Sequence, residues 1–112
     1  MTEPDWIAEH SVIWVLPTGE QHPGRIAISL PRNVGEFEDR CTLALDGLEP
    51  QRAVSGDGTL QALLLAIRYA GYRLHDFTSR GGRVLESDGS EFGLAAIFGP
   101  ILTSAGEYRP PG

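Results

Sequence analysis

The stretch that most constrains the fold of this chain is residues 56–74, GDGTLQALLLAIRYAGYRL. Its apolar residues recur at intervals of three and four, which is the period of a helix that buries one face. We expect that helix to begin near residues 57–59, with a short polar side chain at the N-cap. The predicted core face comprises Leu60, Leu63, Leu64, Ile67, Gly71 and Leu74, with Ala66 and Ala70 at its edge.

Most of the remaining apolar residues alternate with polar ones, as in half-buried strands. Asp46-Gly47 follows one of these runs and favours a tight hairpin turn. Residues 17–24 and 32–39 are rich in turn-forming and polar residues, and we expect them to be connections. The predicted fold is therefore α+β, an antiparallel sheet of about four to five strands with one long helix packed on one face. The predicted strands are residues 7–16, 25–31, 40–46, 51–54 and 83–86.

The chain length of 112 residues suits a single domain, and we expect residues 1–112 to form one α+β unit. Residues 103–112 are polar and rich in proline, which predicts a flexible C-terminal tail. The apolar segment 92–102 is interrupted by Gly99-Pro100, so we expect a buried loop or one helical turn there.

Charge and hydropathy restrict the partners. A net charge of -6 argues against nucleic acid, because affinity for phosphates comes largely from basic side chains. No apolar run approaches the roughly 18 residues of a membrane-spanning helix, and the acidic N-terminus lacks the features of a signal peptide. These features predict a cytoplasmic protein without a membrane partner. They suit a basic protein partner instead.

No catalytic or metal-binding motif stands out. His10, His22 and His75 lack the spacing of a metal site, and all nine basic residues are arginine, so Schiff-base chemistry on lysine is excluded. Cys41 alternates with Leu43 in CTLAL and is predicted to be a buried small hydrophobe. We therefore expect no cofactor, no metal and no catalytic residues.

The leading hypothesis is a non-enzymatic, small acidic interaction protein, for example an inhibitor or immunity-type partner of a basic protein. The alternative is a small-molecule-binding domain or a small enzyme that uses the cleft between sheet and helix. In that alternative, Trp14, His10 or Tyr69 would lie at the mouth of the cleft.

Two groups of residues are candidate contacts. Roughly opposite the predicted core face of the helix lie Gln61, Leu65, Arg68 and Tyr72, with Tyr69 at their edge, a composition enriched at interface hot spots. We expect this stripe to contact a partner or a second copy in a homodimer, unless the tail or segment 92–102 covers it. In GEFED, Glu36, Glu38 and Asp39 surround Phe37 and form either an acidic contact for a basic partner or a solvated loop.

The strand end LDGLE, the helix GDGTLQALLLAIRYAG and the following GGRVL together resemble a bacterial family of small single domains of unknown function. The resemblance covers roughly residues 40 to 95 and depends on structural motifs. Where that family tends to have Asp at the helix cap, this chain has Gly58, with Asp57 one residue earlier. The resemblance implies the fold and implies no activity.

Overall fold

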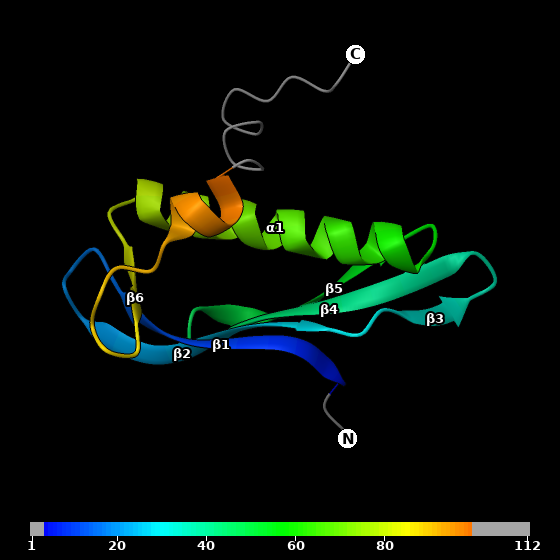
Figure 1. Ribbon diagram of the computed structural model, residues 1–112, viewed down its shortest axis with the longest axis horizontal. Helices are drawn as coiled ribbons and strands as arrows, with labels where there is room; N and C mark the ends of the chain where they lie inside the picture. The colour runs from blue at the N-terminus through cyan, green and yellow to red at the C-terminus, as the bar shows by residue number, and fades with distance from the viewer. Residues whose placement is uncertain (1–3, 100–112) are drawn as a thin grey trace, which may run out of the picture.

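The computed structural model describes residues 4–99, in which six antiparallel strands form one sheet and one long helix crosses it (Figure 1). This arrangement confirms the predicted α+β class. The elements in chain order are β1 (Trp6–Val15), β2 (Gln21–Ser29), β3 (Arg32–Gly35), β4 (Glu38–Asp46), β5 (Glu49–Gly56), α1 (Thr59–Ser79) and β6 (Arg83–Glu86).

The sheet runs β5-β4-β2-β1-β6, and the short β3 pairs with the beginning of β4. The prediction that residues 32–39 form a polar loop was wrong, because they contribute β3, a tight turn and the start of β4. The 17–24 connection is also shorter than predicted, since β2 begins at Gln21. The predicted Asp46-Gly47 turn is confirmed, and Gly47 has the positive φ of 92° that this turn requires.

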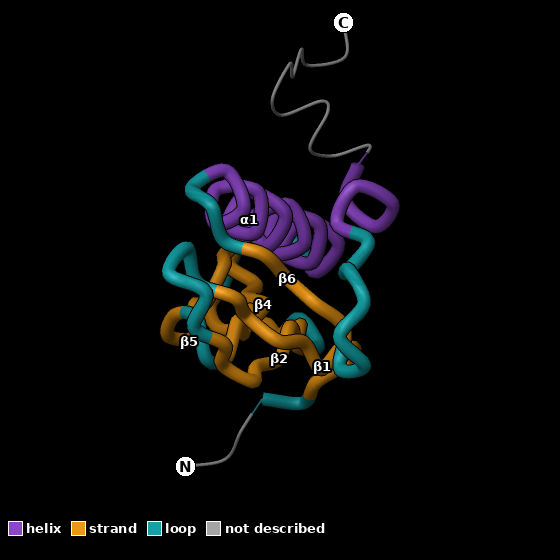
Figure 2. The backbone as a smooth tube through the Cα atoms, turned by 90° about the vertical axis from the view of Figure 1, so that its left-hand side faces the viewer, coloured by secondary structure: helices purple, strands orange, loops and turns teal. Residues whose placement is uncertain are grey.

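Helix α1 packs on one face of the sheet, mainly over β4 and β5 (Figures 1 and 2). The helix-facing side chains of the strands pack with the underside of the helix in one main core cluster and a smaller one. Trp14 is the largest member of the main cluster, and its indole N–H donates to the carbonyl oxygen of Asp46 at 2.7 Å. The main cluster comprises Val12, Trp14, Ile26, Leu43, Leu45, Ala70, Leu74, Val84, Phe92 and Phe98.

The buried face of the helix is shifted from the predicted one. Gly71 and Leu74 are buried as predicted, but Ala66 and Ala70, predicted at the edge of the face, lie within it. Ala62, Ala66, Ala70 and Leu74, spaced four residues apart, are all 0% exposed. The predicted core residues Leu60 and Leu64 are instead exposed, at 68% and 54%, while Leu63 and Ile67 are half-buried at the boundary. Both stripes fit the helical period, so periodicity alone does not choose between them.

A close approach between helix and sheet explains this choice of face. Alanine side chains allow the helix axis to lie nearer the strands than leucine side chains would. The first turn of α1 is especially close to the end of β5, since a Cβ atom added to Gly56 would lie 2.5 Å from the backbone nitrogen of Ala62. Ala62 and Ala66 pack there with Cys41 of β4. Small residues therefore set the spacing between the two layers.

The start of α1 lacks the predicted polar cap. Gly58 is the N-cap residue, with φ of 100°, and no side chain caps it. The backbone N–H of Asp57 donates to the side-chain oxygen of Gln61 at 2.5 Å. A side chain within the first turn thus binds the backbone before the helix, as the second half of a capping box does.

The segment after β6 returns to the helix. Phe92 and Phe98 are buried in the core, and residues 94–99 are helical, which confirms the predicted helical turn within the described part of segment 92–102. The rest of that segment and the predicted tail, residues 103–112, lie outside the described residues. Within residues 4–99, no helix combines the length and the apolar character needed to cross a membrane.

Candidate functional site

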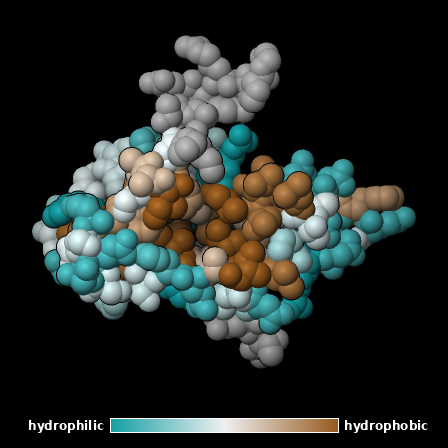
Figure 3. Space-filling model, in the orientation of Figure 1, coloured by the Kyte–Doolittle hydropathy of each residue, from teal (hydrophilic) through white to brown (hydrophobic). Residues whose placement is uncertain are grey.

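An apolar groove opens on the side of α1 that faces β1. Helix α1 lies over β4 and β5, so it leaves part of the face formed by β2 and β1 uncovered. Figure 3 shows apolar surface on this side, below the helix. We call this hollow of about 250 Å³ the β1 groove. It is lined by Ala8, Glu9, His10, Ile26, Ala27, Ile28, Phe92, Ile97 and Phe98.

His10 is held in the wall of the β1 groove. Its Nε2 atom lies 2.6 Å from a carboxylate oxygen of Glu86, and its ring packs edge-on against Phe92 with the centroids 5.5 Å apart. The ring therefore joins β1 to the segment after β6. These contacts give His10 a role in shaping the groove.

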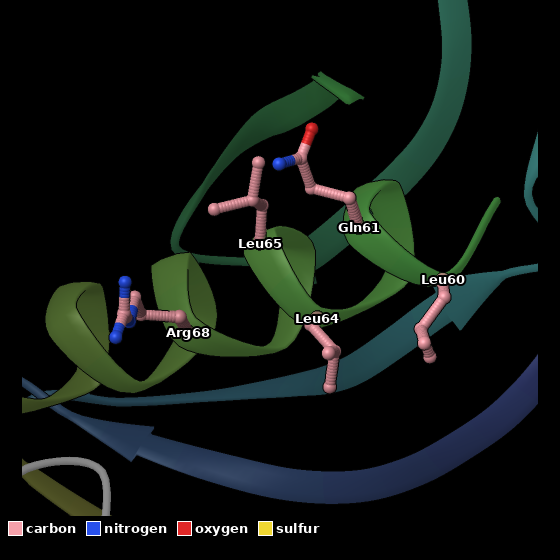
Figure 4. Close-up of a pocket in the computed structure, with 5 residues that line it drawn as sticks. All are labelled: Leu60, Gln61, Leu64, Leu65 and Arg68. Atoms are coloured by element: carbon pink, nitrogen blue, oxygen red, sulfur yellow. The ribbon is translucent and has the colours of Figure 1, made fainter. Parts of the chain in front are cut away.

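The outward side of α1 is also apolar. Leu60 and Leu64 project from one side of the first turns, and Gln61 and Leu65 from the other (Figure 4). A shallow pocket of about 450 Å³ lies against this surface. We call it the outer helix surface, which is lined by Leu60, Gln61, Leu64, Leu65 and Arg68.

The predicted contact stripe of the helix is only partly gathered on this side. Leu65 and Arg68 line the outer helix surface, and Tyr72, further along the helix, is 38% exposed. Tyr69 turns toward β5 instead, where the Arg52 guanidinium lies 4.9 Å from the centre of its ring. Tyr69 therefore belongs to the packing between helix and sheet.

The side of α1 that faces β5 is closed by polar contacts. The Arg73 guanidinium makes an ion pair of 2.8 Å with the carboxylate of Glu49 in β5. Hydrogen bonding to Glu49 raises the pKa of Arg73 above its usual value. Together with the Arg52–Tyr69 contact, this ion pair covers the edge of the core on the β5 side.

The predicted acidic cluster is divided between a turn and a strand. Glu36 and Phe37 occupy the turn between β3 and β4, and Phe37 is 79% exposed. Glu38 lies in β4, where its carboxylate accepts hydrogen bonds from Ser55 at 2.6 Å and Arg40 at 3.0 Å. These bonds lower the pKa of Glu38. Asp39, the next residue of β4, is half-buried.

Of the groups considered for a catalytic cleft, Trp14 and Cys41 are engaged in the core, whereas His10 lines the β1 groove. Trp14 is 0% exposed, so the prediction that it lines the mouth of a cleft was wrong. Cys41 is buried as predicted, its thiol faces the carbonyl oxygen of Ser29 at 3.2 Å, and burial raises the thiol pKa. Within residues 4–99, no three His, Cys, Asp or Glu side chains are grouped to hold a metal ion.

Several residues of the apolar surface were not predicted as contacts. Leu60 and Leu64 were assigned to the core, and Ile97 to a buried segment. One sequence signal did point to them: between Leu60 and Ile67, the helix has more large aliphatic residues than a single face can bury. The β1 groove has no such local signal, because its walls come from three distant parts of the chain.

A scan against protein-family models found no match, and neither did searches of curated proteins and of solved structures. The resemblance of residues 40–95 to a family of small bacterial domains stays a prediction.

Proposed function

We propose that this protein is a small acidic, non-enzymatic binding domain whose protein partner contacts the outer helix surface and the adjoining β1 groove. The exposure of Leu60, Leu64 and Ile97, each more than half exposed, carries the proposal. Single exposed aliphatic residues are ordinary, whereas apolar residues gathered beside a groove are typical of interaction sites. A partner would remove this surface from water.

The charge of the domain selects the kind of partner. The net charge of -6 favours a basic protein, because complementary charge raises the association rate and disfavours other partners. An inhibitor or immunity-type complex with a basic protein fits both the acidity and the apolar surface. Arg68 at the edge of the outer helix surface and Tyr72 beyond it would add the residue types that dominate binding energy in interfaces.

A small-molecule ligand is the second candidate, favoured by the aromatic walls of the β1 groove. Its volume of about 250 Å³ is slightly below the roughly 300 Å³ at which ligand pockets usually begin. A ligand bound by the native state would raise the melting temperature. A metabolite that copurifies with the protein and fills the groove would favour this candidate over a protein partner.

Affinity capture from the native host with two matched baits tests the proposal. The double variant Leu60→Ser/Leu64→Ser should lose a basic protein that the wild type retains in stoichiometric amount. The control Leu30→Ser/Val34→Ser removes similarly exposed apolar groups, which line a different hollow with Thr42 and Ala53, and should retain that protein. Circular dichroism checks the folding of each bait. Equal retention by both variants would contradict the proposed surface.

Light scattering on the purified protein tests the homodimer. If a second copy is the partner, the wild type should have twice the mass of the Leu60→Ser/Leu64→Ser variant. If both proteins have the mass of one chain, the partner is a different protein.

A further inference from the structure

Strand β1 extends well past the strand that pairs with it on the outer side. β6 is only four residues long and pairs with β1 at Val12–Val15. Among residues 4–99, no strand pairs with residues 6–11 of β1 on that side. The first half of β1 is therefore an open sheet edge, and it lies at the front of the molecule in Figure 1.

The hydrogen bonds of β6 show which groups of β1 point to this edge. The N–H of Glu86 and the carbonyl of Val84 bond to residues 90 and 92, on the side away from β1. The backbone N–H and C=O groups of Leu85 therefore point toward β1, and those of its partner Ile13 point toward β6. Because backbone direction alternates along a strand, Ser11 and Glu9 turn their N–H and C=O groups to this side of β1. The Ser11 carbonyl there accepts a hydrogen bond from the Ser87 hydroxyl at 3.5 Å, so Glu9 is the residue whose backbone groups face the open edge.

The open edges at β1 and β5 differ in their surroundings. At the other end, β5 carries Pro50, Gln51, Arg52 and Ser55, and such charged or proline-containing edges resist pairing with other chains. The edge of β1 instead borders the β1 groove, whose lining includes Ala8 and His10. An open edge beside an apolar groove is the geometry used for strand addition, where backbone bonds give affinity and pockets select side chains.

We propose that the partner adds an extended segment antiparallel to residues 7–10 of β1, in line with β6 and beyond the Ser87–Ser11 contact. This inference rests on the proposed function and specifies how the partner binds. The segment alternates apolar and basic residues. Its apolar side chains lie beside Ala8 and His10 on the helix-facing side, next to Ile97 in the wall of the groove.

The basic side chains lie on the opposite face of the sheet, next to Glu9. There the Arg25 guanidinium is shared by two carboxylates, Glu9 at 2.6 Å and Asp46 at 2.6 Å. This group of three side chains carries a net negative charge, and an opposite charge directly across two paired strands is favourable. A lysine or arginine opposite Glu9 meets this condition.

A synthetic peptide that alternates lysine and valine is the probe, with binding measured by isothermal titration calorimetry. In the proposed register, the lysine backbone groups face β1 and the valine backbone groups face away. N-methylation of the lysine amides should therefore weaken binding about tenfold or more, while N-methylation of the valine amides should leave it nearly unchanged.

Three variants of the protein locate the site. Glu9→Pro removes the N–H that faces the edge, whereas Glu9→Ala removes the same carboxylate and keeps the N–H. Glu9→Pro should therefore bind the peptide about tenfold more weakly than Glu9→Ala does. Ala53→Pro changes the outer edge of β5 and should bind like the wild type. Circular dichroism and the melting temperature confirm that each variant is folded.

Each alternative outcome overturns the inference. Equal binding by Glu9→Pro and Glu9→Ala, or no peptide binding by the wild type, would exclude strand addition at this edge. A dimer that Glu9→Pro converts to a monomer would make a second copy the occupant.

If Glu9→Pro still captures the basic protein that Leu60→Ser/Leu64→Ser loses, strand addition fails while the proposed function stands. If the wild type captures no such protein, the proposed function itself fails.

Discussion

The two long sides of helix α1 are built in opposite ways. Toward β5, the ion pair between Arg73 and Glu49 and the stacking of Arg52 on Tyr69 close the boundary between helix and sheet. Toward β1, Leu60 and Leu64 of the helix are exposed, and β1, β2 and the segment after β6 form the open apolar β1 groove. Among residues 4–99, polar contacts cover the boundary of the helix on the β5 side, whereas apolar side chains stay exposed on the β1 side.

The position of the helix over the sheet explains the difference. Because α1 lies over β4 and β5, its β5 side is near the sheet edge, where polar side chains reach both the partner element and water. Its β1 side faces β2 and β1, whose helix-facing residues, such as Ile28, are apolar. Leu60 and Leu64, the most exposed aliphatic residues of the helix, lie on this side, which makes it the better candidate for binding.

The same leucine-to-alanine change on two faces of α1 should give the largest contrast. Leu74 is 0% exposed in the core, and Leu74→Ala should lower the free energy of unfolding by about 2–5 kcal/mol. Leu64→Ala should change it by only about 0.5 kcal/mol, because an exposed side chain loses little burial. Urea unfolding followed by circular dichroism measures both. A comparable cost at Leu64 would show that the open side is part of the core.

Enlarging the small residues beneath the helix should have the next largest effect. Ala66 is 0% exposed and packs with Ala62 and Cys41, so Ala66→Leu must push helix and sheet apart. We expect a loss of about 1–3 kcal/mol in the free energy of unfolding, as for other overpacked cores. Faster native labelling of the Cys41 thiol would provide an independent sign of the widened gap. A variant as stable as the wild type would contradict the close approach.

The ion pair on the β5 side should contribute less. Arg73 has a side chain 38% exposed and Glu49 one 17% exposed, so solvent screens the interaction. A double-mutant cycle with Arg73→Met and Glu49→Gln should give a coupling free energy of about 0.2–1 kcal/mol. Thermal unfolding at low and high salt measures it, and the coupling should shrink as salt rises. A coupling that is zero at both salt concentrations would show that the Arg73–Glu49 ion pair does not stabilise the β5 side.

The smallest effect concerns pH and Glu38. Hydrogen bonds from Ser55 and Arg40 lower the pKa of Glu38 in the folded state. The ionised form therefore favours folding above the pKa of Glu38 in the unfolded chain, and this contribution is lost as pH falls through the folded value. Glu38→Gln should show a shallower loss of stability on acidification than the wild type. Urea unfolding across the acidic range checks this, with Glu36→Gln as the matched comparison.

Much of the secondary structure was predictable because it depends on local patterns. The alternation in CTLAL indicated both a strand and a buried Cys41, and Asp46-Gly47 indicated a turn. Residues 32–39 were misassigned because strand β3 is only four residues long and forms by pairing with β4. Local propensity is weak in a segment of that length.

The candidate site was predictable only in part. Leu65 and Arg68 were expected on the outer side of the helix and lie there. Tyr69, expected at the edge of that stripe, instead packs its ring against the Arg52 guanidinium. The β1 groove combines residues from β1, β2 and the segment after β6. The periodicity of a single segment does not show which distant segments come together to form a groove.

The sequence by itself determined that a long helix forms after Gly58, that alternating strands precede it, and that the domain is acidic. These properties follow from side-chain period and charge, which are local or additive. The tertiary structure decided which of two overlapping stripes on the helix is buried, because that choice depends on how near the alanines let α1 approach β4 and β5. It also decided where β6 ends along β1. A four-residue strand beside a ten-residue one leaves an open edge, and only the pairing of distant segments reveals it.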